Sequence, residues 1–259
     1  MSTIIYPSPV FGPIHSRRLG ISLGVNLMPP DGKVCTFDCL YCECGFNKDF
    51  PAHGKRPSRE QVRGALTTIL AQRHRNGEPL DCITFSGNGE PTGHPDFPGI
   101  INDTLEVRDR YFPEAKVSVL SNATFVGNEA VRRALMMVDN NILKLDTVDE
   151  DYINMVDRPV QPSYNVRKVV ENLKLFNGKV VIQTMFMKGT TAGKSVDNTG
   201  DRFVTPWLEA LKEIAPRLVM IYTIDRETPE HGLRKAEPAE LDAIKARVEQ
   251  QGIACSVSY

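Results

Sequence analysis

The sequence predicts an α/β protein, a partial (βα)6 TIM-type barrel. Three observations support this prediction. Strand-like and helix-like stretches alternate from residue 20 to the end, as in a parallel sheet with crossover helices. Several strand candidates are continuous apolar runs, which is typical of strands covered on both faces. The strand and helix units repeat every 30 to 40 residues or so, roughly as in βα barrels. An open doubly wound sheet is the alternative.

The predicted elements follow in chain order. Strand candidates cover residues 21–27, 82–86, 116–120, 141–146, 179–187, 218–224 and 253–257. Helix candidates lie between them at 58–76, 97–111, 127–138, 163–177, 203–214 and 238–250. In a barrel of this kind the chemistry is expected where strands run into the following loops.

Two helices have clear end signals. Ser58 followed by Gln61 predicts a capping box, and apolar residues then recur at helical spacing. Near the end of the sequence, Pro238 suits a first helical turn and Gly252 can terminate the helix.

The sequence shows no internal linker. No stretch rich in Pro, Gly or Ser divides it, so we expect one domain over residues 1–259. The longest polar interruption, residues 188–202, contains three glycines and predicts a mobile loop. Its Gly189 to Ser195 portion mimics a phosphate-binding P-loop, but the glycine spacing is one residue short and no helix follows.

Charge and hydropathy exclude some classes of protein. Lys and Arg number 31 against 32 Asp and Glu, so a nucleic acid or membrane partner would need a local patch. No apolar run approaches the roughly 18 residues that span a bilayer, and the first residues do not resemble a signal peptide. We therefore expect a soluble, cytoplasmic protein with no membrane partner.

Four of the six cysteines are crowded into ten residues, at Cys35, Cys39, Cys42 and Cys44. Crowded thiols in a reducing compartment hold metal more often than they form disulfides. Three thiolates of one loop can bind three corners of an iron–sulfur cubane and leave the fourth iron open. Zinc with Cys44 or His53 as fourth ligand is the alternative. Cys82 and Cys255 are expected to be buried core thiols.

Polar residues follow several predicted strands. A segment after the second strand contains Gly87, Asn88, Gly89 and Glu90. Glycines there let the backbone approach a ligand closely, and a carboxylate offers acceptors to an ammonium group, although an ordinary Asn-Gly turn is the alternative.

The later strands carry weaker signals of the same kind. Ser121 and Asn122 could hydrogen-bond a ligand after the third strand. Lys144 and Asp146 alternate with apolar neighbours, so both are expected to face the barrel lumen. Gln183 interrupts an apolar run in the same way. Each could equally be a satisfied polar group of the core.

The spacing Cys-x3-Cys-x-aromatic-Cys, formed by Cys35, Cys39, Tyr41 and Cys42, resembles the signature of the radical S-adenosylmethionine (radical SAM) enzymes. The resemblance implies a barrel of the radical SAM kind. It also implies that the three cysteines bind a [4Fe-4S] cluster whose open iron is chelated by SAM, and that Tyr41 flanks the adenine. The 87–90 segment resembles the family's Gly-Gly-Glu segment, with Asn88 in place of a glycine, and would hold the methionyl end of SAM.

The same resemblance implies the reaction. The reduced cluster cleaves SAM to a 5'-deoxyadenosyl radical, which abstracts hydrogen from a substrate, and a low-potential donor such as flavodoxin or ferredoxin supplies the electron. Residues 10–20 resemble small iron–sulfur oxidoreductases related to tRNA wyosine-forming enzymes, and the barrel resembles glycyl-radical activating enzymes. A tRNA base, a protein or a small molecule is therefore the expected substrate. Arg17 and Arg18 could bind a phosphate or carboxylate.

A non-catalytic protein remains the alternative from another class. Residues 51–75 carry six Lys or Arg against one Glu, and this excess could contact RNA phosphates or form a solvated helix face. The cysteines would then hold zinc structurally.

Overall fold

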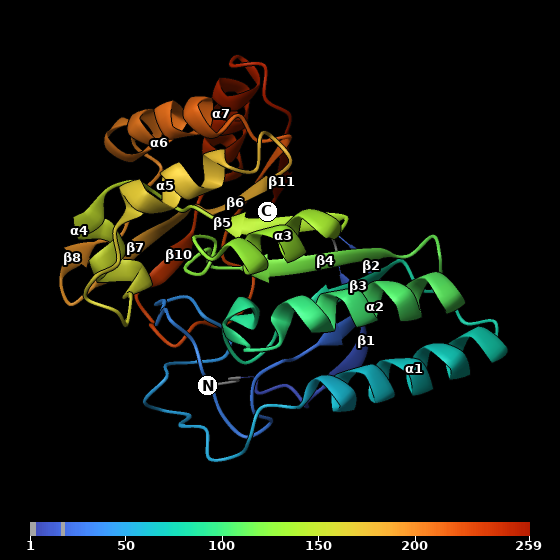
Figure 1. Ribbon diagram of the computed structural model, residues 1–259. Coiled ribbons are helices and arrows are strands. Elements are labelled where there is room, and N and C mark those ends of the chain that lie inside the picture. Colours follow the sequence, from blue (N-terminus) through green and yellow to red (C-terminus); the bar gives the residue numbers. More distant parts are fainter. Residues whose placement is uncertain (1–3, 17–18) are drawn as a thin grey trace.

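The computed structural model of the chain describes residues 4–16 and 19–259; Arg17 and Arg18 lie outside the described residues. Seven parallel strands run in the order β2-β3-β4-β5-β6-β9-β11, and β1 pairs with β2 antiparallel at one edge. The strands are β1 Val10–Ser16, β2 Gly20–Val25, β3 Cys82–Phe85, β4 Lys116–Ser121, β5 Asn140–Lys144, β6 Val181–Met185, β9 Leu218–Tyr222 and β11 Cys255–Ser258. The sheet curls into a half-barrel (Figure 1).

A helix follows each of the first six parallel strands within the described residues. These helices are α1 Arg59–Arg75, α2 Phe97–Tyr111, α3 Glu129–Met137, α5 Val166–Lys174, α6 Asp201–Ile214 and α7 Pro238–Glu249. They cover the outer face of the sheet in the order of their strands (Figure 1). The predicted partial (βα)6 barrel is therefore confirmed. A seventh parallel strand, β11, follows the last helix and forms the edge of the sheet.

The core lies between the sheet and these helices. Successive strands contribute fully buried apolar side chains to it, including Ile83, Val119, Leu143, Ile182 and Val219. Burying one such side chain stabilises the fold by about 1.5–3 kcal/mol. Because side chains alternate along a strand, the residues between them face the concave side, where polar groups gather.

Two predictions about the fold are wrong. β1 was absent from the predicted strands, since Gly12 and Pro13 interrupt its pattern. Residues 188–202 do not form one loop: β7 Met187–Thr191 and β8 Lys194–Ser195 make a hairpin there. With β10 Leu233–Lys235 this hairpin forms a separate three-stranded sheet, because its backbone groups pair with each other instead of with solvent.

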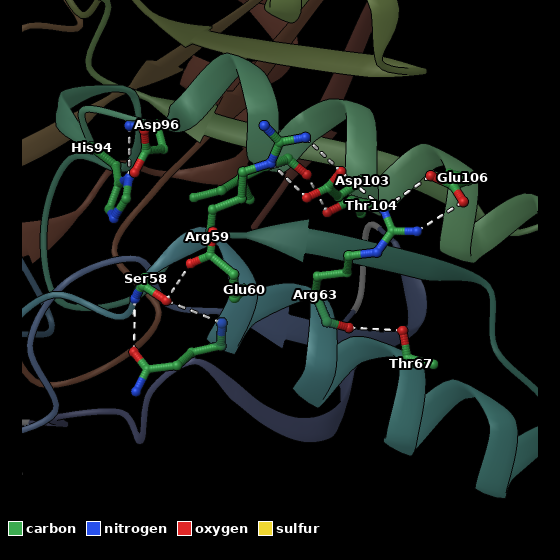
Figure 2. Close-up of polar contacts among 12 residues, drawn as sticks. Ser58, Arg59, Glu60, Arg63, Thr67, His94, Asp96, Asp103, Thr104 and Glu106 are labelled. Carbon is green, nitrogen blue, oxygen red and sulfur yellow. Dashed lines mark hydrogen bonds and ion pairs between the residues drawn. The ribbon is translucent and has the colours of Figure 1, made fainter.

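Three of the six Lys and Arg residues in the stretch 51–75 form ion pairs with neighbouring carboxylates. Arg59 and Arg63 of α1 reach Asp103 of α2 at 2.7 and 2.9 Å, and Arg63 also contacts Glu106 at 2.8 Å (Figure 2). Arg73 pairs with Glu78. Arg59 and Arg63 thus join α1 to α2, and Arg73 joins the end of α1 to the loop that follows it.

Short elements crowd the carboxyl ends of the strands. They are η1 Pro91–Gly93, α4 Glu150–Tyr152 and the π-helical turn η2 Ile153–Asp157. Figure 1 places α4, β7 and β8 at this end, together with the long connection between β2 and α1. Across residues 4–16 and 19–259, none of the helices combines the length and apolarity required to cross a membrane.

Candidate functional site

The cysteine loop, residues 35–44, lies in the connection from β2 to α1 and is held by η2. The backbone N–H of Asp38 donates to the carbonyl of Asp157 at 3.0 Å, and that of Leu40 donates to Val156 at 2.9 Å. These bonds satisfy backbone groups of a loop that has no regular secondary structure of its own. The segment after β5 therefore positions the cysteines.

The thiols of Cys35, Cys39 and Cys42 are free and partly buried. Burial raises the pKa of Cys35 to about 12, with the nearby Glu90 carboxylate adding to the shift. Burial also raises the pKa of Cys39. Cys42 raises the pKa of both other thiols, and Cys35 also raises that of Cys39, so the three thiols are near enough to disfavour one another's ionisation.

This donor set fits an iron–sulfur cluster, whose irons are normally bound by cysteine thiolates. Each thiolate of a cubane binds a different iron, so the sulfurs need to surround a space instead of meeting at one point. In the part of the chain that the structure describes, no three His, Cys, Asp or Glu side chains are gathered around a single ion position.

Cys44 connects the cysteine loop to the glycine segment. Its buried sulfur lies 3.3 Å from the carbonyl oxygen of Gly87, and its single S–H can instead donate to the sulfur of Cys42. This hydrogen bond, together with the positive charge of Lys33, lowers the pKa of Cys42 to about 6 although burial opposes the change. Cys44 thus has a structural role: it lies between Cys42, the third cysteine of the signature, and the glycine segment.

Lys33 is a buried cation that sequence reasoning missed. Its side chain is 1% exposed, and its ammonium group donates to the carbonyl of Gly45 at 2.6 Å and contacts Asp38 at 3.3 Å. Burial alone would lower the pKa of Lys33, but the three thiols and Asp38 raise it. The one signal in the sequence was a lysine two residues before the first cysteine.

The glycine segment packs directly on the cysteine loop. Gly87 and Gly89 both have positive φ, 123° and 141°. A Cβ on Gly89 would lie 1.8 Å from the carbonyl oxygen of Val34, so only glycine permits this approach.

Asn88 and Glu90 of the same segment are engaged within the protein. The fully buried Asn88 side chain donates to the carbonyls of Tyr6 and Pro29, both at 2.9 Å, and accepts the N–H of Tyr6 at 2.8 Å. Asn88 therefore fastens the N-terminal segment. Glu90 accepts the backbone N–H of Asn122 at 2.6 Å, and burial raises its pKa.

Ser121 and Asn122 lie at the carboxyl end of β4. The amide of Asn122 donates to Thr36 at 2.8 Å and lies 3.6 Å from the sulfur of Cys35. The hydroxyl of Ser121 accepts the N–H of Ala123. The predicted polar groups are thus next to the cysteine loop, where they support its conformation.

Lys144 and Asp146, which were predicted to face the lumen, both belong to a buried polar cluster. Lys144 lies 2.9 Å from Asp157 and also contacts Asp146 and the hydroxyl of Tyr41. Burial raises the pKa of Asp157 to about 6, although Lys144 opposes the change. Asp157 was missed by sequence reasoning, because only the π-helical turn brings it to this cluster.

Cys82 is buried as predicted, and its thiol has polar neighbours. Its sulfur lies 3.1 Å from the hydroxyl of Ser118 and 3.3 Å from that of Thr84, and Thr84 bonds Ser22 at 2.6 Å. Cys255 was also predicted to be buried, but it is only partly buried and packs against the apolar core.

A cavity of 440 Å³ opens on the concave side of the sheet. Its lining includes Tyr41, Cys42, Cys44, Gly87 and Gln183, which brings several of the predicted site residues together. The remaining walls come from the inner faces of the strands, from the N-terminal segment and from the loop after β9, including Tyr6, Phe11, Ser22, Thr84, Tyr222 and Arg226. The volume suits a ligand of cofactor size.

Comparison with known proteins places this site in a family. The chain is 28% identical over 255 residues to the UPF0026 protein of Helicobacter pylori strain 26695, covering 97% of this chain and 76% of that protein. A radical SAM methyltransferase from Sphaerobacter thermophilus has a similar fold, with a TM-score of 0.65 at 13% identity over 92% of this chain and 66% of that one.

Streptococcus suis SuiB, whose structure was solved with S-adenosylmethionine, also has this fold, with a TM-score of 0.61 at 15% identity over 90% of this chain. The chain spans half the length of SuiB. The family model of the Radical SAM superfamily matches residues 30–195, which include the cysteine loop, the glycine segment and the buried polar cluster. The chain therefore belongs to the radical SAM superfamily of enzymes.

Proposed function

We propose that Cys35, Cys39 and Cys42 bind a [4Fe-4S] cluster and that the cavity beside them binds SAM. The observation that carries this proposal is the meeting of the cysteine loop and the glycine segment at one cavity, to which Cys42 and Gly87 both contribute. When bound, the cluster would supply the electron that cleaves SAM reductively to a 5'-deoxyadenosyl radical, which abstracts hydrogen from the substrate.

The protein's own side chains would position SAM and exclude water. Tyr41 is held by Asp146 and Lys144, so its ring is fixed at the cavity wall beside the expected adenine. The Gly87 backbone would approach the methionyl end of SAM, and Gln183 offers an amide to the ribose. Asn88, Gly89, Glu90, Ser121 and Asn122 do not line the cavity themselves; their contacts support a role in holding the glycine segment and the cysteine loop in place.

The proposal is tested with protein that is purified and reconstituted anaerobically. We expect iron and sulfide in the wild type and 5'-deoxyadenosine after addition of SAM and dithionite. Alanine at Cys35, Cys39 or Cys42 should abolish this cleavage, whereas Cys255→Ala should retain it because that thiol packs against the core. Zinc without sulfide, or undiminished cleavage in all three variants, would refute the assignment.

The partners belong to the same proposal. A flavodoxin or ferredoxin would supply the electron in a cytoplasmic setting, and the substrate would be a tRNA base, a protein or a small molecule. The identifying measurement is the rate of 5'-deoxyadenosine formation after addition of tRNA, protein or metabolite fractions. The fraction that accelerates this rate contains the substrate.

A further inference from the structure

We propose that Lys33 is a positioning residue of the iron–sulfur site, whose fixed positive charge makes the bound cluster easier to reduce. This inference rests on the proposed function, because it requires the [4Fe-4S] cluster at Cys35, Cys39 and Cys42. It concerns a residue that the radical SAM signature itself does not contain.

Two hydrogen bonds, both through Gly45, link the side chain of Lys33 to Cys42. Its ammonium group donates to the carbonyl of Gly45 at 2.6 Å, and the N–H of Gly45 in turn donates to the carbonyl of Cys42 at 2.9 Å. The lysine side chain therefore enters the turn that carries the third cysteine. Lys33 also stands two residues before Cys35, the first cysteine of the signature.

The positive charge of Lys33 is only partly compensated. Among the described residues, the one carboxylate within ion-pair distance of Lys33 is Asp38, at 3.3 Å. The same carboxylate oxygen also accepts the N–H of Asn47 at 2.8 Å, and Asp38 is 22% exposed. Lys144, in contrast, contacts two buried carboxylates. A buried ammonium group with one shared counter-charge is costly unless other negative groups lie near it.

The positive charge of Lys33 would favour the reduced state of the bound cluster. One-electron reduction takes the cluster core from a charge of 2+ to 1+, so the cluster and its thiolates together become more negative by one unit. A fixed positive charge stabilises the more negative state more strongly, and burial weakens the screening by water. Lys33 therefore raises the midpoint potential of the cluster, which favours its reduction by a donor of given potential.

The experiment compares the midpoint potentials of wild type, Lys33→Met and Lys48→Met after anaerobic reconstitution. Iron and sulfide are quantified first, and the potential is then measured by dithionite titration followed by electron paramagnetic resonance. Lys48 is an exposed lysine of the same connection, so its variant changes the net charge equally without removing a buried charge. We expect a more negative potential in Lys33→Met and an unchanged one in Lys48→Met.

Equal potentials in wild type and Lys33→Met would overturn this inference and leave the proposed function intact. A wild type without iron and sulfide would overturn the proposed function, and this inference with it. Because Lys33→Met also removes the bond to Gly45, Asp38→Asn provides a second test that keeps the lysine in place. Removing this counter-charge should shift the potential to more positive values, and an unchanged or more negative potential would contradict the role of Lys33.

Discussion

At the residue scale, the site is built on buried charges that hold one another in place. Lys144 is 14% exposed at its side chain, and its partners Asp146 and Asp157 are 2% and 3% exposed. Burial opposes ionisation of Lys144, but the two carboxylates raise its pKa. Because Tyr41 hydrogen-bonds Asp146, the cluster also fixes the tyrosine of the cysteine signature.

Replacing Lys144 by Met should therefore destabilise the protein strongly. The change leaves two buried carboxylates without their cation, which costs about 3–5 kcal/mol. The measurement is the free energy of unfolding in urea. The control is Lys116→Met, since Lys116 is 60% exposed and lies 3.7 Å from Asp139, and surface changes of this kind stay within about 0.5 kcal/mol.

A double variant tests the cause of this loss. Adding Asp157→Asn to Lys144→Met removes one of the two carboxylates that have lost their cation. The double variant should therefore be more stable than the sum of the two single effects predicts. A loss below about 1 kcal/mol in Lys144→Met would contradict the view that the cluster is held by its charges.

At the element scale, the first two outer helices are joined by an ionic network. Asp103 of α2 is 7% exposed and receives hydrogen bonds from both Arg59 and Arg63 of α1 (Figure 2). The bond from Arg59 is the main reason that the pKa of Asp103 is lowered.

Asp103→Asn should weaken this helix contact by about 1–2 kcal/mol at neutral pH. Since the folded pKa of Asp103 is lowered, its contribution is complete above the unfolded value of about 3.9 and disappears as the pH falls through the folded value. The difference in unfolding free energy between wild type and variant should therefore decrease towards zero at acidic pH. Glu106→Gln is the control with a smaller effect, because Glu106 is exposed; a difference that stays constant down to strong acid would contradict the ionic origin.

Predictability from sequence also differs between elements. The parallel strands and their helices were predictable because fully buried apolar runs, such as that around Ile83, have a strong local pattern. β1 and the β7–β8 hairpin were not, since their residues are polar or interrupted by glycine and their pairing depends on distant segments. The three-residue β10, for example, pairs with β7 from more than forty positions away.

The residues of the candidate site also differ in how well the sequence predicts them. The cysteine spacing and the glycines are local signals, and the structure brings Cys42 and Gly87 to one cavity. Asp157 had no such signal, and the place of Lys33 two residues before Cys35 does not by itself indicate burial, because an isolated charged residue in a sequence is usually solvated. Their meaning depends on tertiary burial. Asn88 departs from the family's glycine pattern, and only the structure shows that its side chain binds the segment around Tyr6.

At the scale of the whole molecule, the cavity connects distant parts of the chain. Its walls include Ser22 of β2, Gln183 of β6 and Ser258 of β11, together with Tyr6 of the N-terminal segment. A ligand in this cavity contacts strands from one edge of the parallel series to the other. It should therefore stabilise the cooperative fold, and not one loop alone.

The cluster-loaded protein should consequently unfold at a higher temperature when SAM is present. A ligand at one hundred times its dissociation constant stabilises the native state by about 2.7 kcal/mol. For a chain of this size, that corresponds to an increase in Tm of about 5–10 °C. Differential scanning calorimetry under anaerobic conditions and at one scan rate measures the shift. The Cys42→Ala protein should show a smaller increase, because it would lack one ligand of the proposed cluster that helps to bind SAM. An unchanged Tm of the loaded wild type at saturating SAM would show that the ligand does not occupy the cavity enclosed by the strands.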